Sequence, residues 1–295
     1  MRLSAVIFVA ALALAGAGRA QQVADPTGDL TVAEPRWPAD AGPRIAIDAG
    51  HVNFHTVDGR YAPFATVLRN DGLRVAGREG RLTAESLTDV DVLVIANALD
   101  PRNREDWTLP TPSAFTPEEI AAVRAWVEGG GALLLIADHM PFGGSTEALA
   151  AAFGVHFDNS FALIEGPEVF SRANGRMQDS PVTEGLTEVR SFTGSSFQPP
   201  ADAVVPLRLD SAFRIVSPQE AWEFDGQPTR PASADDARLA LLKVGEGRVA
   251  VSAEAAMFTA QVSGPNGRNR TGLNADGAEQ NKALLLNLIR WLAGA

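Results

Sequence analysis

The middle of the chain reads Trp126-Val-Glu-Gly-Gly-Gly-Ala-Leu-Leu-Leu-Ile-Ala-Asp-His139. The apolar run 132–137 has the length of a strand and no polar interruption, which is typical of a strand buried on both faces of a parallel sheet. Three glycines end the helical pattern before it, and a polar turn, Asp138-His139, follows it. This order of helix, glycine break, buried strand and polar turn predicts one unit of an α/β sheet.

Two further apolar runs have the same character, Arg44–Asp48 and Asp91–Ala96. Helical patterns lie between the runs, at 62–70 and 117–128. Alternation of buried strands with amphipathic helices predicts an α/β fold, with a doubly wound, mostly parallel sheet and helices on both of its faces. A barrel would need more repeats of the unit than the sequence contains.

The helix predicted at 117–128 has a defined start. Thr116 is suited to the N-cap, Pro117 to the first helical position, and Glu119 to the third position, where its carboxylate can reach back to the backbone of Thr116. We therefore expect a capping box at this helix.

The second half of the chain is less regular. A hairpin is predicted for 237–244 and 248–252, joined by Gly245-Glu-Gly247, and a closing helix for about 277–292. Stretches rich in Pro and Gly are interpreted as long loops or insertions; they lie at 166–181, 199–231 and 264–277.

The first 20 residues fit a secretory signal peptide, with Arg2 at the start, an apolar core of about residues 5–17, and small residues before Gln21. The apolar run is short for a membrane span, although an uncleaved anchor is the alternative. Residues 21–43, rich in Pro, Asp, Ala and Gly, predict a linker or N-terminal arm, and residues 44–295 the α/β domain. We expect a periplasmic or secreted protein without stable membrane insertion after processing.

Composition excludes several classes of function. The net charge is −11, so the protein repels phosphate backbones, and nucleic acid is not an expected partner. The chain contains no cysteine, which rules out disulfides, thiolate metal sites and thiol nucleophiles.

Polar residues gather where the predicted strands end. In an open α/β sheet, ligands bind outside the carboxyl ends of the strands, so side chains there are the first candidates for chemistry. The candidate catalytic residues are Asp48, His51, His55, Asp138, His139 and Glu254. A histidine could move a proton while a carboxylate fixes its tautomer.

The same cluster could hold a divalent metal. Imidazole and carboxylate groups suit zinc, manganese or iron, and His51, His55 and His139 are the candidate ligands. Spacing alone does not separate a metal site from metal-free acid and base chemistry. The residues expected to bind substrate are Asn53, Thr56, Asn97, Ser195 and Ser196.

Structural roles compete with these assignments at each position. Aspartates after strands often cap the next turn, and loop histidines often bond only to backbone. His156 lies in a strand-like alternation and is interpreted as structural. No His-Glu-x-x-His, Walker or Gly-x-Ser-x-Gly motif is present, so a metalloprotease, a nucleotide site and a serine nucleophile are disfavoured.

Several motifs together resemble a known group. They are Asp48-Ala-Gly-His-Val-Asn-Phe-His-Thr56, Gly59-Arg-Tyr-Ala-Pro-Phe64, Ala137-Asp-His-Met-Pro-Phe142, Asp179-Ser-Pro-Val-Thr-Glu-Gly185 and Ser191-Phe-Thr-Gly-Ser-Ser196. The mature chain resembles uncharacterised bacterial proteins of the DUF4350 and related class I glutamine amidotransferase-like group. The resemblance implies a flavodoxin-like sheet. In true amidotransferases the turn after the glycine-preceded strand carries the catalytic cysteine; here it holds Asp138-His139, so cysteine-dependent glutaminase chemistry is excluded.

These observations lead to two functional expectations. The first is an exported, hydrolase-like protein that acts on a small or carbohydrate-like envelope substrate through the His/Asp/Glu cluster, with or without a metal. The second is a non-catalytic accessory domain that binds a glycan or an envelope protein through the same crevice and the loops around Trp107, Phe161 and Phe170. A purely structural envelope protein is the third reading of the same cluster.

Overall fold

The computed structural model describes residues 22–264 and 267–295. The predicted signal peptide at 1–20 lies outside these residues. Within them, no helix combines the length and the apolar character needed to span a bilayer.

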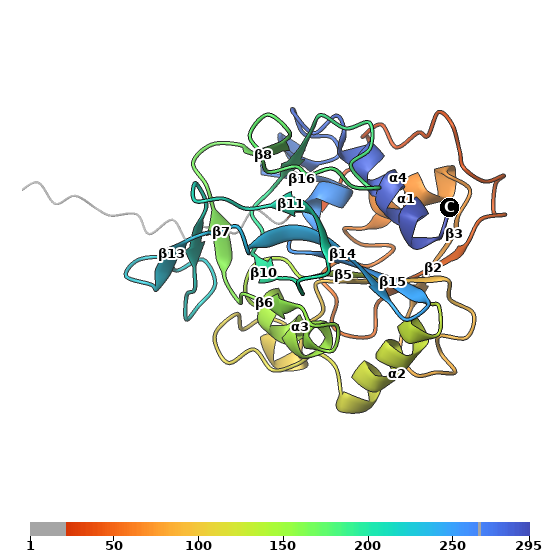
Figure 1. Ribbon diagram of the computed structural model, residues 1–295, viewed down its shortest axis with the longest axis horizontal. Helices are drawn as coiled ribbons and strands as arrows, with labels where there is room; N and C mark the ends of the chain where they lie inside the picture. Colours follow the sequence, from red (N-terminus) through yellow and green to blue (C-terminus); the bar gives the residue numbers. More distant parts are fainter. Residues whose placement is uncertain (1–21, 265–266) are drawn as a thin grey trace, which may run out of the picture.

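The centre of the fold is a mostly parallel sheet (Figure 1). Its parallel strands lie in the spatial order β3-β2-β4-β5-β15. Their bounds are β2 (Arg44–Asp48), β3 (Arg74–Arg78), β4 (Val92–Ala96), β5 (Ala132–Ile136) and β15 (Gly247–Ser252). Counted along the chain, this is the order 2-1-3-4-5 of flavodoxin-like folds, so the predicted doubly wound sheet is confirmed.

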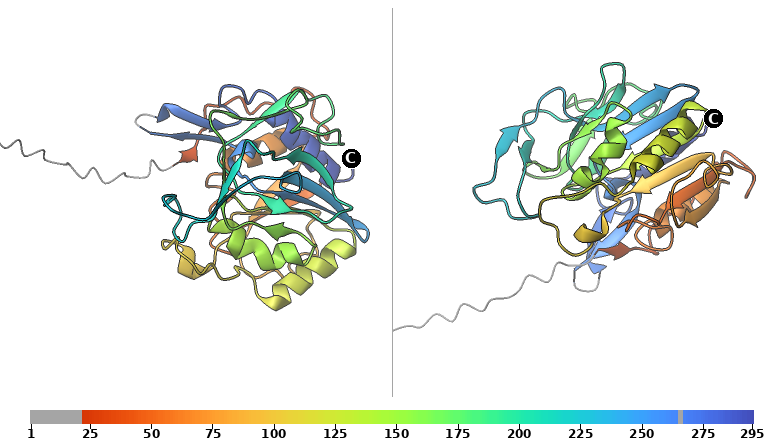
Figure 2. Two further views of the ribbon diagram at one scale, coloured as in Figure 1. Left: turned by 60° about the vertical axis from the view of Figure 1, so that its left-hand side comes forward. Right: turned by 90° about the horizontal axis from the view of Figure 1, so that it is seen from below.

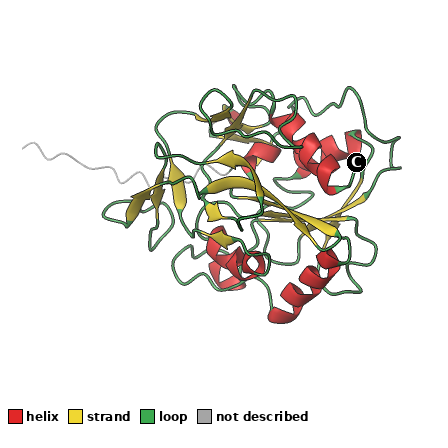
Figure 3. Cartoon of the chain, viewed as in Figure 1, coloured by secondary structure: helices red, strands yellow, loops and turns green. Residues whose placement is uncertain are grey.

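Helices cover both faces of this sheet (Figures 1 and 3). On one face, α1 (Ala62–Asn70) and α4 (Asn281–Leu292) pack into one apolar cluster; on the other, α2 (Pro117–Glu128) and α3 (Phe142–Ala151) pack into a second. Because β4 and β5 are buried at every residue, they contribute to both clusters. This explains their unbroken apolar sequence.

The expected capping box opens α2. The Thr116 side chain accepts a hydrogen bond from the Glu119 backbone, and the Glu119 carboxylate accepts one from the Thr116 backbone. These bonds satisfy two groups that a helix start otherwise leaves unpaired.

The second half holds more strands than its sequence suggests. The predicted hairpin is β14 (Ala237–Val244) with β15, and β14 extends the main sheet in the antiparallel sense. Five short strands lie in the stretches interpreted as loops: β8 (Glu168–Ser171), β11 (Val204–Arg208), β12 (Arg214–Val216), β13 (Thr229–Pro231) and β17 (Asn269–Gly272). Five more lie outside those stretches: β6 (His156–Phe157), β7 (Phe161–Leu163), β9 (Glu188–Ser191), β10 (Phe197–Gln198) and β16 (Ala260–Ser263). Most have two to four residues, too few for periodicity to be recognised.

Residues 22–43 pack against the domain. Strand β1 (Val23–Ala24) pairs with β16 beside β17, as Figure 2 shows. Further along, Asp71 at the end of α1 accepts hydrogen bonds from the Arg36 backbone and from the Arg290 guanidinium of α4. This single buried carboxylate therefore ties the N-terminal arm and the last helix to α1.

Asp71→Ala should lower the free energy of unfolding by about 3 kcal/mol. This is the low end of the cost of breaking a buried ion pair, because Arg290 stays partly exposed. Urea denaturation measures it, with Asp89→Ala as the control, since the Asp89 side chain is 88% exposed in its pair with Arg44. The control should change stability by about 0.5 kcal/mol or less. Equal losses in both variants would contradict the linking role of Asp71.

Candidate functional site

The carboxyl ends of neighbouring strands bring Asn97, Asp138 and Glu254 into one region. Asn97 follows β4, Asp138 lies two residues after β5, and Glu254 lies two residues after β15. The pairing of β4 with β5 and of β5 with β15 places these ends side by side. The expected convergence at this edge is therefore present for these three residues.

Asn97 joins two loops of this region. Its side-chain oxygen accepts a hydrogen bond from the Asp138 backbone at 2.9 Å, and its amide nitrogen lies 3.2 Å from His55 Nδ1. Its backbone oxygen accepts a hydrogen bond from Phe54. A φ of 52° is uncommon for a residue with a side chain, and these bonds hold it there.

His55 is fully engaged at both ring nitrogens. Because Asn97 donates to Nδ1, the ring proton lies on Nε2. The nitrogen of the Gln261 side-chain amide lies 3.1 Å from Nε2, and this amide accepts the proton when it turns its oxygen, which has no other partner in the described chain, toward the ring. Burial, followed by the positive charge of Arg60, holds the pKa of His55 well below its usual value. His55 is thus a neutral residue that fixes Asn97, with no nitrogen left for a substrate or a metal.

His51 belongs to a separate structural group. Its Nδ1 lies 2.9 Å from Asp48 and its Nε2 lies 3.1 Å from Glu119 of α2. Asn53 completes the group: its side chain donates to Asp48 and accepts from the His51 backbone. Burial alone would lower the pKa of His51, but hydrogen bonds and charges from the two carboxylates raise it above its usual value.

This group holds the loop after β2 against α2. Neither His51 nor Asp48 lines the large cavity described below. The Glu119 pKa is shifted the other way: burial would raise it, but hydrogen bonds from Thr116, His51 and Leu82 lower it. Asp48 and His51 were predicted to be catalytic, but the polar atoms of both side chains have partners in the loop or on α2. Both residues therefore have a structural role here.

A cavity of about 930 Å³ lies over the strand ends. Its floor holds the buried groups His55, Asn97, Asp138 and His139, and its walls carry five aromatic side chains. The wall residues are Phe54, Trp107, Phe142, Phe192 and Trp222. A large cavity that combines several aromatic side chains with a few convergent polar groups is the usual form of a small-molecule site.

His139 presents one free nitrogen to this cavity. Its Nδ1 donates to the carbonyl oxygen of Met140 at 2.7 Å, which fixes the tautomer with an unprotonated Nε2. The ring stacks on Phe161, with centroids 4.5 Å apart, and meets the edge of Trp222 at 4.7 Å. Within 22–264 and 267–295, no hydrogen bond reaches Nε2, so this atom is available to a ligand.

Asp138 lies beside His139 and shares its environment with Glu254. Burial raises the pKa of Asp138, and burial with repulsion from Asp138 raises that of Glu254 well above the usual value. Glu254 accepts hydrogen bonds from the backbones of Ala256 and Met257, whereas Asp138 faces the cavity. The two carboxyls titrate as a pair that retains a proton beyond the range of ordinary carboxyls.

The predicted serines lie behind the site. Ser195 donates to the backbone oxygen of Asp138 at 3.0 Å, and Ser196 donates to Asp158. Both are fully buried and neither lines the cavity. Ser195 holds the turn after β5 in place, and Ser196 is bonded to the residue after β6. The sequence predicts substrate contact for both, but neither is placed to contact a ligand in the cavity.

Of the other loop residues predicted to contact a ligand, some line the cavity and others do not. Thr56 uses its backbone oxygen to accept hydrogen bonds from Gly59 and Tyr61, and does not line the cavity. Phe170 is fully buried against Phe213 in the core, so it cannot contact a ligand. Trp107 does line the cavity, as the second functional expectation requires.

Two loops beside the cavity, one around Trp107 and one around Trp222, are joined by backbone hydrogen bonds. The Leu109 backbone donates to Gln219, and the Ala221 backbone donates to Trp107. Trp222 has a φ of 76°, and Thr193, which also lines the cavity, has a φ of 66°. With Asn97, three of the five non-glycine residues with positive φ in the described chain therefore line this cavity, a concentration of backbone strain typical of functional sites.

The three imidazoles proposed as metal ligands do not form a ligand set. His51 and His55 use both ring nitrogens for other partners, and His139 has one nitrogen free. In the part of the chain that the structure describes, no group of three or more His, Cys, Asp or Glu side chains is placed to hold a metal ion. The described residues therefore show no set of three ligands for the expected zinc, manganese or iron ion, and this metal site stays a prediction.

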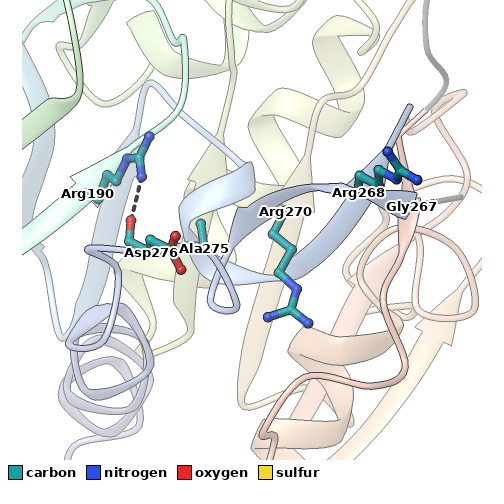
Figure 4. Close-up of a pocket in the computed structure, with 6 residues that line it drawn as sticks. All are labelled: Arg190, Gly267, Arg268, Arg270, Ala275 and Asp276. Carbon is teal, nitrogen blue, oxygen red and sulfur yellow. Dashed lines mark hydrogen bonds between the residues drawn. The ribbon is translucent and has the colours of Figure 1, made fainter. Parts of the chain in front are cut away.

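A second cavity, of about 530 Å³, lies between β9 and β17 (Figure 4). Three arginines line it: Arg190, Arg268 and Arg270. In Figure 4, Arg190 points to Asp276, while the other two guanidinium groups lie away from it and from each other. These charges do not converge on one point, so this cavity is a weaker candidate for a ligand.

His51→Gln should destabilise the protein in a pH-dependent way. A pKa raised in the folded state means that protonation of His51 stabilises the fold below about pH 6.5, and that this stabilisation is lost as the pH rises through the folded pKa. The loss caused by the substitution should be largest near pH 6 and smallest near pH 9. Denaturation across this range checks it, and a constant difference would refute the charged pair.

Asp138→Asn should gain stability relative to wild type as the pH rises. In the unfolded chain Asp138 ionises near pH 3.8, whereas in the folded chain its pKa is higher, so the wild type loses stability between these two pKa values. The gain should level off once the folded wild type has also lost the proton. Urea denaturation from about pH 4 to about pH 8 tests this, with the exposed Asp202→Asn as control. A falling relative stability of the Asp138 variant would contradict the retained proton.

Comparison with known proteins supports the fold and leaves the family open. No family model and no curated protein matches the sequence. The solved mmIFT52 N-terminal domain is similar, with 16% identity, a TM-score of 0.59, and coverage of 84% of this chain and 97% of that one. The cytoplasmic protein STM1381 from Salmonella typhimurium LT2 shows 16% identity and a TM-score of 0.50 over 84% and 98% of the chains.

A structure described as a ThuA-like protein from Bacteroides uniformis matches 88% of this chain and 93% of that chain, with 14% identity and a TM-score of 0.46. Together with the strand order, the similarities to these first two structures show a flavodoxin-like α/β fold. The resemblance to the DUF4350 group stays a prediction.

Proposed function

We propose that this protein binds a small, carbohydrate-like substrate in the cavity over β4 and β5 and hydrolyses it with His139 as the base. The observation that carries the proposal is the free, unprotonated Nε2 of His139 on the floor of an aromatic cavity. A base must reach the proton that it removes, and His139 is the histidine of the cavity with an open nitrogen.

The cavity walls support the carbohydrate class. Sugar rings expose faces of C–H groups that pack on aromatic rings, and hydroxyl groups that need hydrogen-bond partners. Phe54, Trp107 and Trp222 offer apolar faces, while Asp138 and His139 offer polar atoms at the floor. A wall of this composition holds a ligand with both kinds of surface.

The chemistry needs one base and one acid. His139 Nε2 takes a proton from water as the water oxygen attacks the electrophilic carbon, and the bond from Nδ1 to Met140 stabilises the resulting imidazolium. Asp138, whose pKa burial raises, is the acid that gives a proton to the departing oxygen. Return of the proton from His139 to Asp138 through water restores both groups.

Binding without turnover is the second candidate function. The specific observation in its favour is the packing of His139 between Phe161 and Trp222, which makes the ring part of the aromatic wall. In this case the cavity would recognise a glycan or a partner protein without changing it. Both candidates place the protein outside the cytoplasm, as the predicted signal peptide suggests, and both take the same cavity as the binding site.

His139→Gln should lower turnover by roughly 10²–10⁴-fold, the usual contribution of a general base. Affinity should change little, because Gln keeps a polar group of similar reach. A panel of p-nitrophenyl glycosides gives the rates, and calorimetry with the methyl glycosides gives the affinities. His156→Gln is the matched control, since His156 is exposed and pairs with Glu147 away from the cavity.

Equal turnover in the His139 variant and in wild type would refute the assignment of the base. Binding in wild type without any turnover would select the second candidate. If both the His139 variant and a Trp222→Ala variant bind the ligand as tightly as wild type, the ligand binds outside this cavity.

A further inference from the structure

Arg60 is a cavity residue that the proposed chemistry does not use. It lies just before α1, and its guanidinium is fixed by neutral partners: Nε donates to the Gln22 backbone oxygen at 2.9 Å and Nη1 donates to the Phe54 backbone oxygen at 3.2 Å. The guanidinium carbon lies 3.7 Å from the centroid of the Phe54 ring. The orientation of this cation is therefore set by the protein before any ligand binds.

The charge of Arg60 has no counterpart in the described chain. Within 22–264 and 267–295, no carboxylate forms an ion pair with it, whereas the other internal arginine of this region, Arg238, pairs with Glu168. Burial lowers the pKa of Arg60, with no opposing contribution from an acid. Removing a cation from water without a partner costs free energy, so proteins rarely keep one without a use for it.

The other charged groups of the cavity do not supply the missing anion. Asp138 lines the floor of the cavity but forms no ion pair with Arg60 in the described chain. Arg104, Glu105 and Glu223 also line the cavity, but all three are solvent-exposed at its mouth. No carboxylate that lines the cavity is therefore paired with Arg60 in the described chain.

We propose that the ligand supplies this anion, and that the protein takes carboxylate-bearing sugars of the uronic acid class, with the carboxylate on Arg60. The inference rests on the proposed function and narrows its substrate class. A guanidinium has five N–H donors, of which Gln22 and Phe54 occupy two. The three left, on Nη1 and Nη2, suit the two oxygens of a planar carboxylate.

The aromatic walls and Arg60 then have complementary roles. The sugar ring packs against the aromatic side chains, as a neutral sugar would, and the acidic group selects among sugars of the same shape. An uncharged analogue leaves the half-buried guanidinium without an acidic partner, which favours the acidic ligand over the neutral one.

Calorimetry at pH 7 with matched pairs of methyl glycosides tests the inference. The pairs are glucuronate and glucose, galacturonate and galactose, and mannuronate and mannose; inorganic phosphate is a further probe. We expect the acid member of at least one pair to bind tenfold or more tightly than its neutral partner. Arg60→Gln should reduce that preference to less than threefold.

Arg104→Gln is the matched control, because it removes a positive charge at the mouth of the same cavity. It should change the acid preference by less than threefold. Arg60→Lys keeps the charge but loses the planar fork, and should give an intermediate preference. If thermal denaturation shows that Arg60→Gln does not fold, the Lys variant becomes the test. In that case we expect Arg60→Lys to bind the acid sugar more weakly and the neutral sugar as tightly as wild type.

The outcomes separate this inference from the proposed function. Equal binding of acid and neutral sugars, or an acid preference that survives in Arg60→Gln, overturns the role of Arg60 but leaves a carbohydrate site. Phosphate that competes with the best acid sugar at equal affinity overturns the carboxylate assignment. Failure of every sugar, acid or neutral, to bind overturns both proposals.

Discussion

The Asn97 side chain is the contact on which the site depends. Its side-chain oxygen accepts a hydrogen bond from the Asp138 backbone after β5, and its amide nitrogen donates to the ring of His55 in the loop after β2. Its backbone oxygen accepts a hydrogen bond from the Phe54 backbone. The side chain can reach these partners because β4 lies between β2 and β5 in the sheet. Without this amide, the floor of the cavity and its Phe54 wall would not be fixed relative to each other, and the Asp138-His139 turn would lose one of its two anchors, the other being Ser195.

The protein uses its histidines in different ways. His51, between two carboxylates, is a charged structural link, and His55, between two amides, is a neutral one. His139 bonds to a backbone carbonyl through one nitrogen and keeps the other open. The environment of each ring, and not its position at a strand end, decides which of them can do chemistry.

The sequence predicts the parts of the fold that have strong local signals. The continuous apolar runs correspond to β2, β4 and β5, and Thr116 and Glu119 mark the start of α2. Strand β3 was not predicted because Arg74–Arg78 lies at the edge of the sheet, is largely exposed and has no continuous apolar run. Of the site, Asn97, Asp138 and His139 follow from the rule of strand ends. That rule predicts which residues lie near one another but not which atoms they contact, so it also selected Asp48 and His51. It missed Arg60 and Trp222, which long-range packing brings to the cavity.

The central claim is that His139, and not His51, is the reactive histidine. Nitrogen NMR of the four imidazoles tests it directly, because ring nitrogens with and without a proton have widely separated chemical shifts. The account predicts a His139 signal of the Nδ1-protonated tautomer that moves when a bound sugar is added, and a His51 signal with both nitrogens protonated near pH 6 that does not move. A proton on His139 Nε2 in the free protein, or a ligand-induced shift at His51 alone, would contradict it.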